Sequence, residues 1–104
     1  MFYKARRFRI NLKLSVQRAL LGAIYPNIRA IAIGGIGTKK LKITCYLDRQ
    51  PTEFDYDNIS DIAGEILGDM VEFNEVEEKC EFTTEYISKL DHLDFWAYIR
   101  KESF

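Results

Sequence analysis

The chain is poor in the residues from which small catalytic and metal sites are built. Its 104 residues include one histidine and two cysteines. Cys45 and Cys80 lie far apart, with no CxxC pair and no second histidine, so we predict two small buried side chains, no metal site and no disulfide bond. Any Ser-His or Cys-His nucleophile would have to use His92, whose position in a loop favours a surface or capping role. We expect no enzyme activity and no cofactor.

Long apolar runs are also missing. Arg9, Asn11 and Lys13 interrupt the apolar residues near the start, which does not fit a signal peptide. No stretch reaches the ~20 apolar residues of a membrane-spanning helix. We therefore expect a cytoplasmic protein that does not bind membranes. The length fits a single domain over residues 1–104, and the apolar fraction of 47% is that of a globular protein.

Acidic residues are absent from the first 47 positions. Residues 1–47 contain ten lysines and arginines, whereas residues 48–104 contain all sixteen acids and five bases. The two parts thus carry formal charges of +10 and −11, which together give the net charge of −1. This asymmetry indicates either an electrostatic partner or two halves of the chain that face each other.

Hydrophobic periodicity and turn residues predict six elements in the order α-β-β-α-β-β. Residues 1–10 are basic and aromatic and are predicted to form an N-terminal arm or a short edge strand. The predicted elements are a helix from Ser15 to about Tyr25, strands over 29–34 and 39–47, a helix from the N-cap Thr52 to about Val71, and strands over 73–83 and 95–101. Two hairpins, each preceded by a helix, most simply form an α+β fold with a four-stranded, mainly antiparallel sheet and both helices packed on one face.

The first hairpin contains a glycine-rich turn that does not fit a phosphate-binding loop. Residues 34–40 lack the GxxxxGK[ST] spacing, and a strand follows them instead of a helix. In the return strand, Leu41, Ile43, Cys45 and Leu47 are predicted to face the helices. The opposite face is predicted to be partly open to solvent. It offers a secondary binding patch of three aromatic residues, Tyr46, Trp96 and Tyr98.

The last predicted hairpin starts with an irregular strand and is joined by a short connection. Over residues 73–83, Val76, Cys80 and Phe82 alternate with charged residues, and Glu78 breaks the alternation. The break predicts a bulge or an exposed edge. Residues 84–93 are predicted to form a loop or a short helical turn.

A row of carboxylates on the second predicted helix is the strongest candidate for a binding site. Like charges spaced i,i+4 destabilise a helix by ~0.2–0.5 kcal/mol per pair. The row therefore lowers the stability of this helix, and its presence needs an explanation. Either the basic half of the chain neutralises it, or it meets a cationic partner. The candidate partner-binding residues are Asp57, Asp61, Glu65, Asp69 and Glu72, with Glu75 and Glu77 as continuations.

Two other functions are compatible with the charge pattern. The basic arm, in which Phe2, Tyr3 and Phe8 alternate with lysine and arginine, could bind phosphates and stack on bases as a small nucleic-acid-binding module. The acidic pI of about 5.8 argues against the nucleic-acid-binding hypothesis. Alternatively, the arm of one copy could lie on the acidic helix of another, which would give a homo-oligomer.

Several segments of the chain form a recognisable signature. They are Arg18-Ala-Leu-Leu-Gly-Ala-Ile-Tyr-Pro-Asn-Ile-Arg-Ala-Ile, Tyr46-Leu-Asp with Pro51-Thr-Glu-Phe-Asp, Ile59-Ser-Asp-Ile-Ala-Gly-Glu-Ile-Leu-Gly-Asp and Trp96-Ala-Tyr-Ile-Arg-Lys-Glu. They resemble a group of short bacterial proteins that includes colicin-like and contact-dependent growth inhibition immunity proteins. The resemblance covers about residues 16–102. It implies a non-enzymatic inhibitor that binds a cognate toxin domain, often a nuclease with a basic cleft, in which the carboxylates would take the place of phosphates. The resemblance assigns no contact residues.

Overall fold

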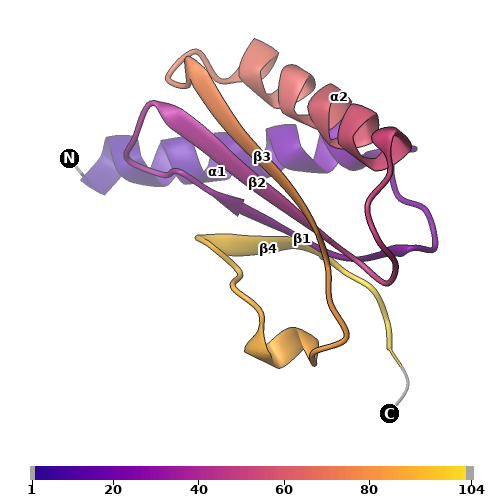
Figure 1. The fold of residues 1–104 in the computed structure, drawn as a ribbon. Coiled ribbons are helices and arrows are strands. Elements are labelled where there is room, and N and C mark those ends of the chain that lie inside the picture. Colours follow the sequence, from indigo (N-terminus) through magenta and orange to yellow (C-terminus); the bar gives the residue numbers. More distant parts are fainter. Residues whose placement is uncertain (1, 103–104) are drawn as a thin grey trace.

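The computed structural model describes residues 2–102, and the side chains of residues 5–102. Two helices lie on one face of a four-stranded sheet (Figure 1). The elements are α1 (Phe2–Leu20), β1 (Ile28–Gly34), β2 (Lys40–Leu47), α2 (Glu53–Asp69), β3 (Glu75–Phe82), the 3₁₀ turn η1 (Ile87–Lys89) and β4 (Phe95–Ile99). The predicted order α-β-β-α-β-β and the α+β class are confirmed, as is the glycine-rich turn between two antiparallel strands.

The sheet is mixed, with strand order β3-β2-β1-β4. β1 is antiparallel to β2 and to β4, whereas β2 and β3 are parallel. The prediction of a second hairpin is therefore wrong, because β3 and β4 lie at opposite edges of the sheet (Figure 1). A parallel pair needs a long crossover connection, and α2 provides it between β2 and β3.

The predicted N-terminal arm is wrong, because residues 2–10 are the first half of α1. Phe8 continues the buried stripe of this helix at helical spacing and packs edge-on against Phe73, with ring centroids 5.6 Å apart. The buried residues of the same stripe are Leu12, Ser15, Val16 and Ala19. Ser15 is therefore an interior residue of the helix and not its N-cap. Met1 lies outside the described residues.

The main core lies between the helices and the sheet. Leu41, Ile43, Cys45 and Leu47 face the helices as predicted. Cys45 is the register neighbour of Cys80 on β3. Both are free and buried, which confirms the prediction of small buried side chains.

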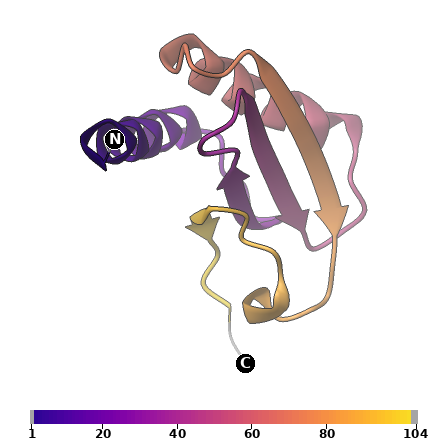
Figure 2. The ribbon, with the colours of Figure 1, turned by 90° about the vertical axis from the view of Figure 1, so that its left-hand side faces the viewer.

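The opposite face of the sheet is covered where the sequence predicted an open surface. The connection from β3 to β4 passes beneath the sheet and carries η1 (Figure 2). Ile87, Leu90 and Leu93 pack there on a second cluster of buried residues: Ala30, Ala32 and Tyr46. β1 is consequently buried along its whole length, on both faces. The near-continuous apolar run of β1 is the usual signal of such a strand.

An irregularity in β4 places Trp96 and Tyr98 on different faces of the sheet, although the sequence predicted them on the same face. Tyr98 pairs with Ile31 and Trp96 pairs with Ala32, so two steps along β4 match one step along β1. Such a bulge changes which side chains share a face. Tyr98 therefore packs on the helix side with the main core, while Trp96 lies on the covered side.

For β3 the sequence predicted either a bulge or an exposed edge. β3 is an edge strand, and no bulge interrupts its register with β2. Glu78 lies on the helix side, where its carboxylate accepts a hydrogen bond from the Ser60 hydroxyl of α2. That contact explains why an acidic residue replaces an apolar one in the alternation.

Candidate functional site

α2 carries an acidic row that the protein leaves uncovered. The helix contains six acids and no base, and Asp57, Asp61 and Glu65 are exposed. Within the described part of the chain, none of these three carboxylates has an ion-pair or hydrogen-bond partner. We name these three residues the α2 acidic row. The described side chains of the basic half therefore do not neutralise it.

Asp69 differs from the rest of the predicted row. Its carboxylate accepts hydrogen bonds from the Ser15 hydroxyl at 2.7 Å and from the Arg18 guanidinium at 3.1 Å. These bonds, the one from Ser15 first, lower the pKa of Asp69 below its ordinary value. Asp69 thus joins α2 to α1 and is less available to a partner.

The other predicted acids do not continue the row. Glu72 lies beyond the end of α2, in the turn before β3, and lines a shallow groove with Asn11 and Leu14 of α1. Glu75 and Glu77 project from the opposite face of the sheet. There they are register neighbours of Lys40 and Lys42 on β2. One flat partner surface cannot contact both the α2 acidic row and these two glutamates.

Asp55 is the buried acid of α2 and has a structural role. Its carboxylate accepts hydrogen bonds from the Tyr25 hydroxyl, from both terminal nitrogens of Arg49, and from the backbone N–H and hydroxyl of Thr52. Burial acts to raise the pKa of Asp55, but the hydrogen bonds from Arg49 and Tyr25 outweigh it and hold the pKa well below its usual range. Thr52 is the N-cap, as predicted, and Asp55 completes its capping box.

The three predicted patch aromatics do not share a surface. Tyr46 is buried beneath the β3–β4 connection, where its hydroxyl donates to the Asp91 carbonyl at 2.8 Å. Trp96 packs edge-on against Tyr46, with ring centroids 5.9 Å apart. Tyr98 lies on the other side of the sheet, against α1. The cause is the bulge in β4, which the sequence pattern does not reveal.

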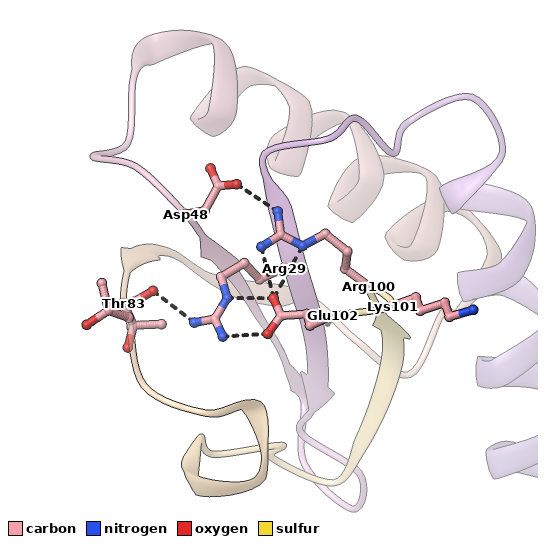
Figure 3. A pocket seen from close by; sticks show the side chains of 7 residues that line it. Arg29, Asp48, Thr83, Arg100, Lys101 and Glu102 are labelled. Atoms are coloured by element: carbon pink, nitrogen blue, oxygen red, sulfur yellow. Dashed lines mark hydrogen bonds and ion pairs between the residues drawn. The ribbon is translucent and has the colours of Figure 1, made fainter. Parts of the chain in front are cut away.

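A cluster of charged residues lines a hollow at the end of the sheet, and its acids and arginines pair with one another. Glu102 lies between two guanidinium groups (Figure 3): it accepts two hydrogen bonds from Arg29, both at 2.8 Å, and two from Arg100. Arg100 also binds Asp48 at 2.7 Å. The hydrogen bonds from Arg29 and then Arg100 lower the pKa of Glu102 to about 2. With two arginines matched by two acids, the cluster holds residues 100–102 against β1, and its guanidinium groups are already occupied by carboxylates.

Among the described side chains, no catalytic constellation is assembled around His92. Its ring is exposed and lies 6.1 Å from that of Trp96. The neighbouring Asp91 and Asp94 side chains accept backbone hydrogen bonds from Leu93 and Ile36. No group of His, Cys, Asp and Glu among the described residues is arranged to hold a metal ion. Over the same residues, no helix combines the length and apolar character needed to span a membrane.

The outer side of α1 is a second exposed surface, which the sequence prediction missed. α1 carries six bases and no acid. Among the bases, Ile10 and Leu14 are exposed, and their i, i+4 spacing places them on one side of the helix. Leu21, the first residue after the helix, is also exposed and extends this apolar stripe into the turn. The sequence analysis overlooked this apolar stripe because it did not predict residues 2–10 as helix.

The fold and its surfaces thus define a small α+β protein with two oppositely charged helices side by side and their outer faces exposed. The chain belongs to the MafI2 immunity protein family, whose model matches residues 9–102. Membership makes it an immunity protein, a class that neutralises a cognate toxin by binding it, and the predicted resemblance to immunity proteins is confirmed. No curated protein matches the chain.

Proposed function

We propose that the protein neutralises a nuclease toxin in the cytoplasm by placing the α2 acidic row over the basic surface that binds the nucleic-acid substrate. The observation that carries this proposal is the exposure of Asp57, Asp61 and Glu65 without a cationic partner in the described chain. A nuclease must attract phosphates, so its substrate cleft presents lysine and arginine. Carboxylates along a helix complement such a cleft and exclude the polyanion.

The outer face of α2 also suits a close partner. A Cβ atom added at Gly64 or Gly68 would meet no atom within 4 Å. Glycine lowers helix stability by ~1 kcal/mol relative to alanine, so internal packing does not account for these two residues. Their lack of side chains lets a partner approach the helix closely beside Asp61 and Glu65.

Charge reversal on α2 tests the proposal. The toxin domain encoded in the adjacent reading frame would be titrated with wild-type protein and with the double variant Asp61→Lys/Glu65→Lys. We expect at least about tenfold weaker binding for the variant, mainly through slower association, because exposed charges act chiefly on the encounter rate. The difference should shrink in 0.5 M salt, where exposed charges are screened.

The matched control is Glu75→Lys/Glu77→Lys. It makes the same change in charge on the opposite face of the sheet and should bind as the wild type does. Equal toxin affinity of the α2 variant and the control variant would refute the role of the α2 acidic row. A loss of affinity confined to the control would place the interface on the face of the sheet opposite the helices. Incubation of the toxin with plasmid DNA and with transfer RNA tests its class. A toxin that cleaves neither would exclude the nuclease target.

A further inference from the structure

The outer side of α1 combines an apolar stripe with a basic border. Leu14, in the second half of α1, is 49% exposed, and Leu21, in the turn directly after α1, is 80% exposed. Arg6, Arg9 and Lys13 are exposed around them. Figure 2 views α1 nearly along its axis, and no other described element covers the side turned away from the sheet.

The stripe continues into a hollow between α1 and the edge of the sheet. Leu14 and Leu20 line it from α1, Leu21 and Ile24 line it from the following turn, and Tyr98 lines it from β4. Its volume is about 590 Å³. Apolar side chains of a partner would fill this hollow, since a well-packed pocket is where binding energy concentrates.

We propose that this face of α1 is the second half of the toxin interface, and that it receives a segment of the toxin in which carboxylates surround an apolar ridge. The inference rests on the proposed function. Charge indicates the occupant: Arg6, Arg9 and Lys13 are exposed beside the stripe, so a segment that buries Leu14 and Leu21 needs an acidic border, because like charges opposed across an interface are strongly unfavourable.

A second copy of the chain fits this face less well. α1 against α1 would oppose the exposed bases Arg6, Arg9 and Lys13 with the same bases of the second copy. α2 would supply acids, but its exposed apolar side chains, Phe54 and Tyr56, are confined to its first turn and could not fill a stripe that runs along α1. A nucleic acid would match the bases but would leave three aliphatic side chains against phosphates and sugars.

The two surfaces together would set the orientation of the complex. The α2 acidic row and the basic border of α1 lie on neighbouring helices of one layer (Figure 1). The proposed pose places the basic cleft of the toxin on α2 and its acidic segment on α1. In the reversed pose the basic cleft would face the bases of α1 and the acidic segment would face the acids of α2, so like charges would oppose each other. This arrangement would select one partner and one pose.

Binding of the same toxin domain tests the inference with the variant Leu14→Gln/Leu21→Gln. Both positions are exposed, so far-UV circular dichroism and the urea midpoint should match those of the wild type. We expect at least about tenfold weaker binding, equivalent to about 1.4 kcal/mol, and a loss that persists in 0.5 M salt. The control is Ile99→Gln, a residue also 49% exposed but on the opposite face of the sheet, which should bind within twofold of the wild type.

A second variant, Arg6→Glu/Arg9→Glu, tests the chemistry of the occupant. It should weaken toxin binding and reduce its salt dependence. Wild-type affinity of Leu14→Gln/Leu21→Gln, with loss only in Asp61→Lys/Glu65→Lys, would overturn the inference and leave the proposed function intact. Failure of the wild-type protein to bind the toxin would refute both the proposed function and the inference about α1.

Two further results would assign α1 to another occupant and would also overturn the inference. The first is sedimentation of the protein alone as a dimer that Leu14→Gln/Leu21→Gln abolishes. The second is binding of a fluorescent RNA or DNA oligonucleotide that Arg6→Glu/Arg9→Glu abolishes.

Discussion

Replacing Asp55 by asparagine should destabilise the protein far more than the same change two residues later. The Asp55 side chain is 0% exposed and accepts hydrogen bonds on both oxygens, the best defined being from Arg49 at 2.6 Å and from the Thr52 N–H at 2.7 Å. Asparagine keeps one acceptor oxygen and turns an NH₂ group toward donors. The change thus removes the charge and leaves buried donors unmatched.

The size of the effect follows from the partners. Removing one member of a buried ion pair destabilises a protein by about 3–5 kcal/mol. Arg49 is 35% exposed and can be rehydrated in part, so we take the lower end, about 3 kcal/mol. With a urea dependence of about 1–3 kcal/mol per molar, the unfolding midpoint should fall by about 1–3 M. Urea titration followed by Trp96 fluorescence measures it.

The matched control is Asp57→Asn, the same substitution on the exposed side of α2. Its free energy of unfolding should stay within about 0.5 kcal/mol of the wild type. A loss below about 1 kcal/mol for Asp55→Asn, or equal losses for both variants, would refute the assignment of Asp55 as a buried structural acid.

The pH dependence gives an independent check. The folded-state pKa of Asp55 lies below its ordinary value, so its charge contributes stability that is fully present above about pH 4 and is lost as the pH falls toward the folded pKa. Asp55→Asn lacks this contribution. The difference in unfolding free energy between wild type and variant should therefore be constant from pH 5 to 7 and should narrow below pH 4. A difference that widens in acid would contradict the reasoning.

The remaining predictions concern glycines and the chain end. Gly64→Ala should raise the free energy of unfolding by up to about 1 kcal/mol, because the added methyl group meets no atom. Gly35→Ala should lower it by about 3 kcal/mol or more in the same urea titration, because φ is +97° and the Cβ would lie 2.0 Å from the Lys40 carbonyl oxygen. Glu102→Gln should destabilise the protein by about 2–3 kcal/mol at pH 7, and urea midpoints should show this difference shrinking as the pH falls from about 4.5 toward the folded pKa of about 2.

Local patterns were enough to predict most elements of this fold. Alternation along β2 predicted which side chains face the helices, and the threonine before α2 marked its start. These features depend on neighbours three or four residues away, or two in a strand, so the sequence alone contains them. The charge division between the two parts of the chain is of the same kind, and so is the resemblance to immunity proteins.

Strand order and the sharing of surfaces required the tertiary structure. Nothing in residues 73–83 indicates that β3 pairs in parallel with β2, because the pairing depends on where α2 returns the chain. The bulge that separates Tyr98 from Trp96, and the connection that buries Tyr46, likewise depend on contacts between distant segments. The order of residues determined that this protein has a basic half and an acidic half. The packing of α1 beside α2 decided that Asp69 is paired, while Asp57, Asp61 and Glu65 have no ion-pair partner among the described residues, because only side chains brought within a few ångströms can neutralise one another.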